Sequence, residues 1–419
     1  MVAGVMFSSS ASFSKSGTSP GKHWRSRRRT LMMLLVVAGG VSALLLAGGY
    51  FSYMFWGFRE TTIRNGVGHL QIFNARAFDR DETRVLENGL AGYESVRSIA
   101  RSTPHVTGVA PRIEFFGMVS NGQKSGTYMG TAVVPAEERK MHFVPQVLAG
   151  RWFSPEGGEN EVIVGAGLAR SMNVKPGGGL TLLAVTADGA LNGIDVDVVG
   201  VITTHFKELD DRLLQMTLPA AQRLLQTDRV TKLVVGLDNT DRTQAVRAVL
   251  ASRLAGSQPR VILKDWQELS PMYRQIVLMF GGILTFMAII IFFMVVMSSS
   301  NTMMMAMFER TREVGTMLAL GTPRAWVLAL FVLEGALTGV LGAAAGLLAG
   351  NGIAALLNRA QIQLPPPPGN STGFPLRIFH VPEYMILASI LVVLTLAAAS
   401  IPPAWRASRL KVVEALAHI

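Results

Sequence analysis

Side chains that commonly perform chemistry are dispersed along this chain of 419 residues. The seven histidines lack the close spacing by which one helix presents two zinc ligands, and the absence of cysteine excludes disulfides, thiolate catalysis and cysteine metal sites. The Gly-x-x-x-x-Gly-Lys-Ser/Thr loop that cradles a nucleotide phosphate does not occur. The sequence therefore predicts no catalytic site, no metal site and no ATP hydrolysis in this chain.

Paired aspartates are the remaining candidates for a metal or acid–base site. They occur as Asp79 with Asp81, Asp195 with Asp197, and Asp210 with Asp211. Two neighbouring carboxylates can bind a hard cation through oxygen. Turns and solvated strand ends also collect aspartates, because the short side chain bonds to nearby backbone. We favour the turn and strand-end interpretation for all three pairs.

Four stretches lack charge over a length that can cross a bilayer, which takes roughly 20 largely apolar residues. They are residues 31–58, 275–308, 325–357 and 384–405. Glu334, inside the third stretch, is the single exception. An ionisable group within a span is a functional candidate by default, although a structural hydrogen bond to a neighbouring helix explains it more simply. The expected fold class is an α-helical integral membrane protein with four transmembrane helices.

Basic residues predict the orientation, because Lys and Arg of short segments stay in the cytoplasm. They gather in the arm 1–30, the loop 309–324 and the tail 406–419. The segment 59–274 and the loop 358–383 are then extracytoplasmic. This placement also accounts for much of the net charge of +11 without a nucleic-acid partner.

The first apolar stretch has a second interpretation, a cleaved signal peptide. A basic run precedes it, and small residues occur at Ala47-Gly48-Gly49. The apolar core of a signal peptide usually has about 7–15 residues, whereas this stretch is longer and ends in an aromatic cluster typical of the membrane interface. These features favour a retained anchor.

The large segment 59–274 mixes strand and helix patterns, which predicts an α+β extracytoplasmic domain inserted between helices 1 and 2. One strand–helix–strand unit is expected near each end of it, with a strand-rich part between them. We therefore expect two lobes, a membrane-proximal α+β lobe of about 68–112 and 220–266 and a distal β-rich lobe of about 113–219. The expected helices bury Leu86, Leu90, Tyr93, Val96 and Ala100 in the first unit and Val246, Val249, Leu250 and Leu254 in the second.

The loop 309–324 has the most specific pattern in the chain. Its first half is charged, its second half is apolar, and Gly321-Thr322-Pro323 predicts a helix stop. It could be a plain positively charged loop with a short amphipathic helix, or a coupling helix that lies along the membrane and docks into a partner. The candidate coupling residues are Glu309, Arg310, Arg312, Glu313, Gly315, Leu320, Gly321 and Arg324.

At this loop the chain resembles the FtsX-like permeases, which are membrane subunits of ABC transporters and include the lipoprotein-releasing and macrolide-exporter types. The resemblance extends to further motifs, which are Leu333-Glu334-Gly335 with Gly339, Gly342 and Gly346, Pro403-Ala404-Trp405-Arg406-Ala407 with Val413-Glu414-Ala415-Leu416, Gly68-His69-Leu70-Gln71-Ile72, Leu148-Ala149-Gly150-Arg151-Trp152 and Gly165-Ala166-Gly167-Leu168-Ala169. It covers nearly everything after Leu31.

The resemblance implies a type VII ABC transporter permease, multi-pass in the bacterial inner membrane, with a MacB-like core domain in the periplasm. It implies that two permeases, identical or paralogous, pair above two cytoplasmic ATPases. Those ATPases would bind ATP and Mg²⁺, so no cofactor is expected here. Because only the arm 1–30 precedes the first span, the ATPase is expected to be a separate chain.

The same resemblance implies mechanotransmission, in which ATP hydrolysis moves the periplasmic domain. The expected cargo is a lipoprotein or another lipophilic envelope molecule. Drug or peptide efflux through a periplasmic adaptor, and signalling to a periplasmic hydrolase, remain alternatives. The stretch 184–194, where one lipoprotein-releasing permease carries a carrier-docking hairpin, is short here and predicts an ordinary turn.

Two further patterns leave their roles open. The small residues from Gly335 to Gly350 fit a seam between two permeases, and they fit packing within one subunit equally well. The run that begins at Pro365 and ends at Gly369 predicts a stiff connector rather than a binding motif.

Overall fold

The computed structural model describes residues 20–78, 86–154, 158–365 and 373–409. The chain divides into two compact units. We call Met1–Tyr53, Phe280–Gln361 and Arg377–Ile419 the helical unit, and Met54–Met279 with Ile362–Leu376 the α/β unit. Asp79, Asp81 and the proline run after Pro365 lie outside the described residues.

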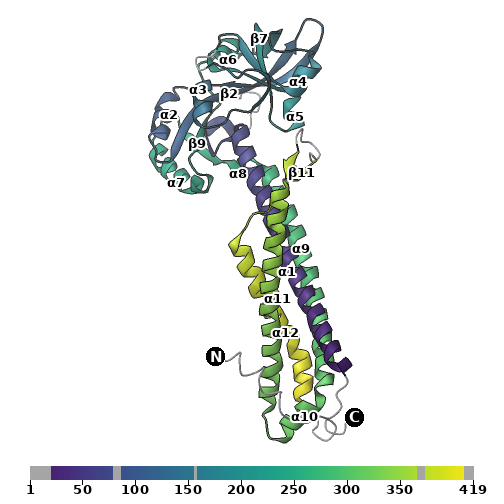
Figure 1. The fold of residues 1–419 in the computed structure, drawn as a ribbon. Helices are drawn as coiled ribbons and strands as arrows, with labels where there is room; N and C mark the ends of the chain where they lie inside the picture. The colour runs from purple at the N-terminus through teal and green to yellow at the C-terminus, as the bar shows by residue number, and fades with distance from the viewer. Residues whose placement is uncertain (1–19, 79–85, 155–157, 366–372, 410–419) are drawn as a thin grey trace. The chain divides into compact units, whose positions relative to one another are not determined.

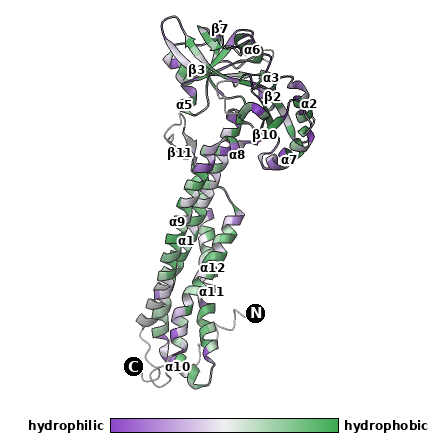
Figure 2. Ribbon diagram, turned by 180° about the vertical axis from the view of Figure 1, so that it is seen from behind, coloured by the Kyte–Doolittle hydropathy of each residue, from purple (hydrophilic) through white to green (hydrophobic). Residues whose placement is uncertain are grey.

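The helical unit is formed by four long helices and a short one (Figure 1). The long helices are α1 (Pro20–Thr62), α9 (Pro271–Glu309), α11 (Arg324–Ala360) and α12 (Pro382–Ser408). Each is long and apolar enough to cross a membrane, and hydrophobic residues predominate along them in Figure 2. Within the described part of the chain these are the candidate spans, so the prediction of four transmembrane helices is confirmed.

Glycines of α11 form one face of that helix, and two neighbouring helices pack against it. A Cβ atom on Gly346 would lie 2.7 Å from Val41 Cβ in α1, and one on Gly339 would lie 3.0 Å from Val393 Cα in α12. The Ser42 hydroxyl also donates to the Gly346 carbonyl oxygen at 2.8 Å. The sequence left open whether this glycine face forms a seam between two permeases or packs within one subunit. In the structure it packs within one subunit. Its buried glycines are Gly335, Gly339, Gly342, Gly346 and Gly350.

The α/β unit contains the predicted lobe with one strand–helix–strand unit at each end, which we call the βαβ lobe. Its strands are β1 (Leu70–Asn74), β2 (Val106–Ser120), β9 (Lys232–Leu237) and β10 (Val261–Asp265), paired antiparallel in the order β10–β1–β9–β2. Helices α2 (Glu94–Arg101) and α7 (Thr243–Leu254) contact each other and this sheet. Strand order and helix positions are those of a split βαβ fold.

The strands inserted between β2 and β9 close into a small barrel, which we call the barrel lobe. Pairing runs from β2 to β3 (Ser125–Val133), β8 (Leu213–Thr217), β5 (Glu161–Gly165), β7 (Leu191–Thr203) and β6 (Gly179–Val185), and β6 pairs with β2 again. Closure leaves no free edge among these strands. Strand β4 (Gln146–Gly150) pairs outside the ring with β7, and helix α6 (Leu218–Leu225) contacts several barrel strands.

Short helices and turns complete the α/β unit. They are η1 (Ile63–Val67), η2 (Ala75–Phe78), α3 (Pro135–Lys140), α4 (Ala166–Ser171), α5 (Lys207–Asp210), η4 (Thr240–Arg242) and α8 (Trp266–Leu269), with the two-residue strands β11 (Gln363–Leu364) and β12 (Phe374–Pro375). The turn between β6 and β7 spans residues 186–190, and Gly189 there has φ +85°. The ordinary turn expected at this position is therefore confirmed.

Two local predictions differ from the structure. Residues 86–93 form turns rather than the start of a helix, because Gly92 has φ +60° and Leu90 pairs with Val230 in an isolated bridge. Val249 of α7, which was expected to be buried, is 43% exposed.

The sequence predicted a border between the two lobes at residues 112 and 113. Strand β2 crosses this border without a break and continues from one lobe into the other. Its first half pairs with β9 and its second half pairs with β3 and β6. The two lobes therefore share a strand instead of meeting at a linker.

His69 connects the βαβ lobe internally as a neutral imidazole. Its Nδ1 accepts from the Leu237 amide at 3.1 Å, which leaves Nε2 to donate to the Thr240 hydroxyl at 3.2 Å. The ring is 7% exposed, and burial is the main cause that lowers its pKa to about 4. Protonation of Nδ1 would break the bond from Leu237.

We expect this histidine to make stability fall in acid. Because the folded pKa lies below the unfolded value, the unfolded chain binds the proton first, so stability is full above pH 6.5 and declines from there toward pH 4. The decline should be on the order of 2–3 kcal/mol. Urea unfolding at a series of pH values should give a flatter profile for His69→Gln, while His380→Gln, at an exposed histidine of the helical unit, should keep the native slope. Equal slopes in all three proteins would contradict the assignment.

Candidate functional site

The predicted coupling loop forms a short helix, α10 (Thr311–Ala319), between α9 and α11. Helix α9 ends at Glu309, and Arg310 leaves helical conformation with φ −106°. After α10 the chain turns through Gly321, whose φ of +88° favours glycine, and α11 begins at Arg324 behind Pro323. Figure 1 shows α10 at one end of the long helices of the helical unit. These backbone breaks allow α10 to leave the direction of both spans.

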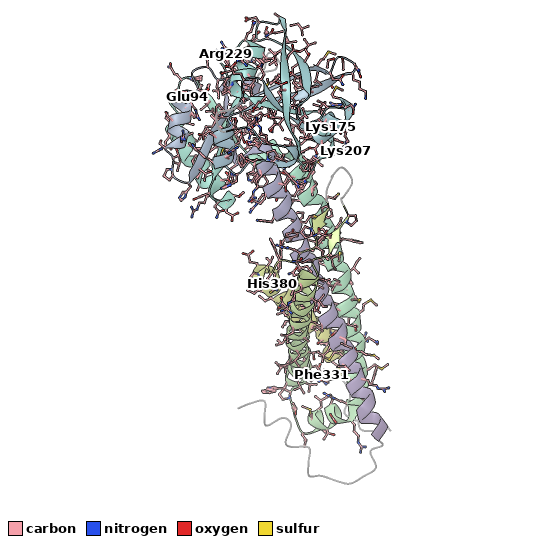
Figure 3. The ribbon with its side chains drawn as sticks, turned by 45° about the horizontal axis from the view of Figure 1, so that its top comes forward. Glu94, Lys175, Lys207, Arg229, Phe331 and His380 are labelled. Carbon is pink, nitrogen blue, oxygen red and sulfur yellow. The ribbon has the colours of Figure 1, made fainter. Side chains whose placement is uncertain are left out.

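One face of α10 is buried in the helical unit. Thr311, Val314 and Gly315 are buried, and Val314 belongs to an apolar cluster with residues of α9, α11 and α12, among them Phe331, labelled in Figure 3. Gly315 thus packs inside this chain rather than on a surface for a partner. The other members of the cluster are Met307, Val327, Ala404 and Ala407.

The opposite face of α10 and its flanks carry the other candidate residues. Arg312 and Glu313 are exposed, as are Glu309 and Arg310 before the helix and Gly321 and Arg324 after it. Leu320 is 83% exposed, and Trp326, which the sequence analysis did not single out, is 72% exposed. This surface, which we call the α10 surface, offers charges of both signs beside apolar groups. Such a composition suits directional docking of a protein partner.

Glu334, the carboxylate inside the third span, contacts the start of this segment. Arg310 Nη1 lies 3.3 Å from Glu334 Oε2 and 3.4 Å from Oε1. The pair links the junction of α9 and α10 to α11. The sequence indicated both residues separately but not their pairing, since they are 24 positions apart.

One aspartate of each pair within the described residues has a structural partner. Asp210 accepts from the Thr203 hydroxyl at 2.6 Å and from the Thr204 amide at 2.8 Å, so it ties the end of β7 to α5. Asp195 accepts from the Thr181 hydroxyl across the β6–β7 pair at 2.7 Å. Among the described residues no three His, Asp or Glu side chains are grouped as metal ligands would be.

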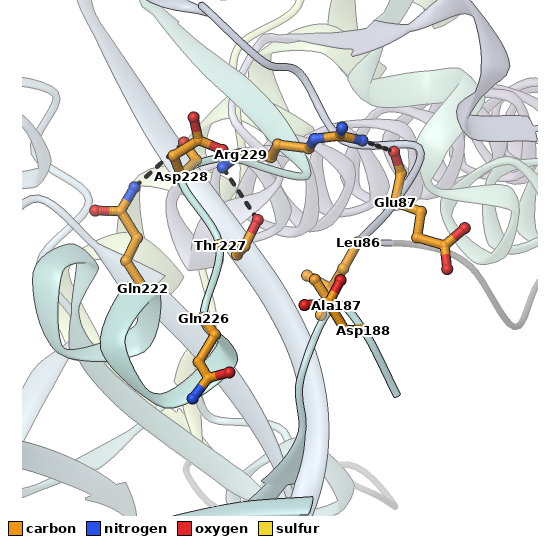
Figure 4. A pocket seen from close by; sticks show the side chains of 9 residues that line it. All are labelled: Leu86, Glu87, Ala187, Asp188, Gln222, Gln226, Thr227, Asp228 and Arg229. Carbon is orange, nitrogen blue, oxygen red and sulfur yellow. Dashed lines mark hydrogen bonds between the residues drawn. The ribbon is translucent and has the colours of Figure 1, made fainter. Parts of the chain in front are cut away.

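A polar depression of about 610 Å³ lies in the α/β unit (Figure 4). It is bordered by Leu86, Glu87, Ala187, Asp188, Gln222, Gln226, Thr227, Asp228 and Arg229. Several of its polar groups bond to the lining itself. Gln222 donates to the Asp228 carbonyl oxygen, the Arg229 amide donates to the Thr227 hydroxyl, and the Arg229 guanidinium donates to the Glu87 carbonyl oxygen. This arrangement explains the depression as a surface junction of turns.

An apolar patch on the outside of the barrel was not predicted. Phe116 is 76% exposed and Leu191 is 71% exposed, and Met118 and Val185 are more than half exposed. Met118 pairs with Leu183, and Val185 pairs with Leu191, so register places these side chains on one face. The sequence of β2 carried a signal for this patch, because apolar residues occupy the positions that face outward as well as those that face the barrel core. Exposed apolar patches of this kind often mark contacts with other molecules.

Comparison with known families gives two matches along the chain. Residues 30–253 match the MacB-like periplasmic core domain, and residues 282–412 match the FtsX-like permease C-terminal model. The first match includes the α/β unit up to the end of α7, and the second includes α10, α11 and α12.

Curated relatives are similar at low identity. The lipoprotein-releasing system transmembrane protein LolC of Xylella fastidiosa is 25% identical over 335 residues, which are 77% of this chain and 80% of the relative. LolE of Haemophilus influenzae is 23% identical over 265 residues, 62% of this chain and 63% of that protein. The macrolide export ATP-binding/permease protein MacB of Chlorobium luteolum is 27% identical over 281 residues, 63% of this chain and 41% of the relative.

Among solved structures, the comparison finds the periplasmic region of MacB from Actinobacillus actinomycetemcomitans. It aligns with a TM-score of 0.36 and 15% identity over 51% of this chain and 95% of that one.

The two family matches agree with the order of elements described above, in which a large α/β domain separates the first candidate span from the other three. The relatives named above are a transmembrane protein of a lipoprotein-releasing system and a macrolide export ATP-binding/permease protein. The chain therefore belongs to the FtsX-like permeases with a MacB-like periplasmic core domain, which are type VII ABC transporter permeases of the bacterial inner membrane.

Proposed function

We propose that this permease converts ATP hydrolysis by a separate cytoplasmic ATPase into movement of its periplasmic domain. The observation that carries the proposal is α10, whose buried face is fixed among three spans while its charged face is exposed. A helix held in this way can transmit a push from a docked partner to the spans. ATP and Mg²⁺ are assigned to that partner, because the sequence lacks a phosphate-binding loop.

Helices α1 and α9 are the proposed route of transmission. Each is a continuous helix with one part in the helical unit and one part in the α/β unit. A regular helix resists bending and stretching because every backbone group within it is bonded to the next turn. Displacement of either helix at its cytoplasmic end should therefore move residues of the α/β unit.

The proposed cargo is a lipoprotein or another lipophilic envelope molecule taken from the inner membrane. Similarity to LolC and LolE, named for lipoprotein release, supports this cargo over the macrolide suggested by the MacB name, since LolC aligns over more of its own length. We propose that a second permease, a copy or a paralogue, completes the complex. The apolar patch around Phe116 supports a periplasmic carrier or adaptor as a further partner.

Purification of the tagged chain in mild detergent, with mass spectrometry of all bound proteins and lipids, tests this cargo and these partners. We expect an ABC ATPase together with lipid-modified protein. An ATPase with a periplasmic adaptor would replace lipoprotein release by efflux, and an ATPase with a cell-wall hydrolase would replace it by signalling. Recovery without any ATPase would contradict the coupling function itself.

Neutral replacement of Arg312 and Glu313 together should weaken ATPase docking. Arg312→Gln with Glu313→Gln keeps helix propensity while removing charge-assisted contacts, each of which contributes about 1.5–3 kcal/mol. We expect co-purification of the ATPase to fall at least about tenfold, which corresponds to 1.4 kcal/mol. Lys207→Gln with Glu208→Gln, a matched exposed pair on α5 marked by Lys207 in Figure 3, should have no effect. Unchanged ATPase binding and full transport in the α10 variant would refute the docking assignment.

The Arg310–Glu334 pair should position α10 for coupling. Glu334→Gln should reduce ATP-dependent transport roughly fivefold, because interactions between contacting residues are commonly about 1 kcal/mol. The exchange Arg310→Glu with Glu334→Arg should restore most of that loss, since the pair reforms with opposite polarity. A transport assay on reconstituted complexes measures both effects. Failure of the exchange, with normal membrane insertion, would show that Glu334 acts through something other than Arg310.

A further inference from the structure

The chain beyond α1 is unwound inside the α/β unit. Helix α1 ends at Thr62 and is followed directly by η1, in which Asn65 and Gly66 leave helical conformation. Gly66 has φ +114°, a backbone conformation that favours glycine. A Cβ atom there would also lie only 2.8 Å from Arg112 Nη1, so the space at this position favours glycine as well. An unwound turn leaves backbone carbonyl groups that need other partners.

Two hydrogen bonds supply such partners, and a third joins the Asn65 side chain of this turn to the barrel lobe. Arg112 Nη1 donates to the Gly66 carbonyl oxygen at 2.5 Å, and Gln71 of β1 donates to the Val67 carbonyl oxygen at 2.7 Å. Asn65 donates to the carbonyl oxygen of Thr204, just after barrel strand β7, at 2.6 Å. The turn that follows the first span is therefore bonded to the βαβ lobe and to the barrel lobe at once.

Arg112 is the centre of this contact. Its Nε and Nη2 donate to the two carboxylate oxygens of Glu138 in α3, at 3.0 Å and 2.7 Å, and both side chains are at most 4% exposed. Arg112 also lies where β2 passes from one lobe to the other, since Arg112 pairs with Lys232 of β9 and Ile113 pairs with Ala132 of β3. One guanidinium thus joins the end of η1, the shared strand and α3.

A buried ion pair of this kind adds little net stability, because desolvation of both charges offsets much of their attraction. Replacing both partners by apolar groups of similar size is often neutral or stabilising, whereas removing one partner leaves an unpaired buried charge. What apolar groups cannot supply is the directional bond to the Gly66 carbonyl oxygen. The pair is therefore better explained by the attachment that it makes than by stability.

We propose that Arg112, oriented by Glu138, is a positioning residue that clamps the end of the first span to the junction of the two lobes, so that a displacement of α1 moves both lobes together. The inference rests on the proposed function, because it assumes that ATP hydrolysis moves α1. It identifies the residues through which that movement reaches the domain.

The test uses the full permease with its ATPase, reconstituted in lipid, and a fluorescent unnatural amino acid at position 175. Lys175 is exposed on the barrel lobe and is labelled in Figure 3. In the otherwise native complex, ATP should change its fluorescence. In Arg112→Met with Glu138→Leu, we expect the melting temperature and ATP hydrolysis to be retained while the ATP-dependent fluorescence change falls at least about fivefold.

A cross-link separates attachment from other effects. The native chain has no cysteine, so Asn65→Cys with Thr204→Cys can be joined by oxidation or a short bismaleimide without side reactions. In the Arg112→Met, Glu138→Leu background, joining these positions should restore the fluorescence change, and reduction of the disulfide should abolish it. The matched control is Arg223→Met with Glu159→Leu, which removes an exposed pair of the same unit and should change nothing.

The outcomes are distinct. An undiminished fluorescence change in the Arg112→Met, Glu138→Leu complex would overturn the clamp, and so would a loss that the cross-link does not restore. Absence of any ATP-dependent change in the otherwise native complex would instead contradict the proposed function. A loss restored by the cross-link would support the clamp.

Discussion

Close approach of helix backbones at the glycine face of α11 is the contact on which the helical unit depends. Within a bilayer, helices gain little from hiding apolar surface from one another, so association relies on packing and hydrogen bonds. The missing side chains of Gly339 and Gly346 let α12 and α1 reach the backbone of α11. The apolar cluster that holds α10 is built on this packing, since its members come from α9, α11 and α12 as well.

A second constraint acts in the α/β unit, where two lobes share β2. A strand common to two sheets makes each lobe depend on the placement of the other. Burial at that junction concentrates charge: Arg112 pairs with Glu138, and Lys232, whose pKa is lowered by burial, pairs with Glu114. These pairs orient neighbouring elements where apolar contacts alone would leave their direction open.

The two constraints agree with a permease that transmits movement. Rigid attachment is found at α10, the proposed docking helix for the ATPase, and at η1, where the first span ends. Helices α1 and α9 carry the chain continuously between the two units.

The sequence by itself determined the features that rest on local composition. Uncharged stretches located the four spans, alternating patterns located most strands, and Gly321-Thr322-Pro323 located the end of α10, because each depends on residues close together in the chain. Tertiary structure decided the rest. Whether the α11 glycines served a dimer or one subunit, which carboxylate Arg310 would meet, and that Arg112 would bridge Glu138 and Gly66, all depend on contacts between distant residues. The helix expected from Leu86 failed for the same reason, since Leu90 pairs with Val230 far along the chain.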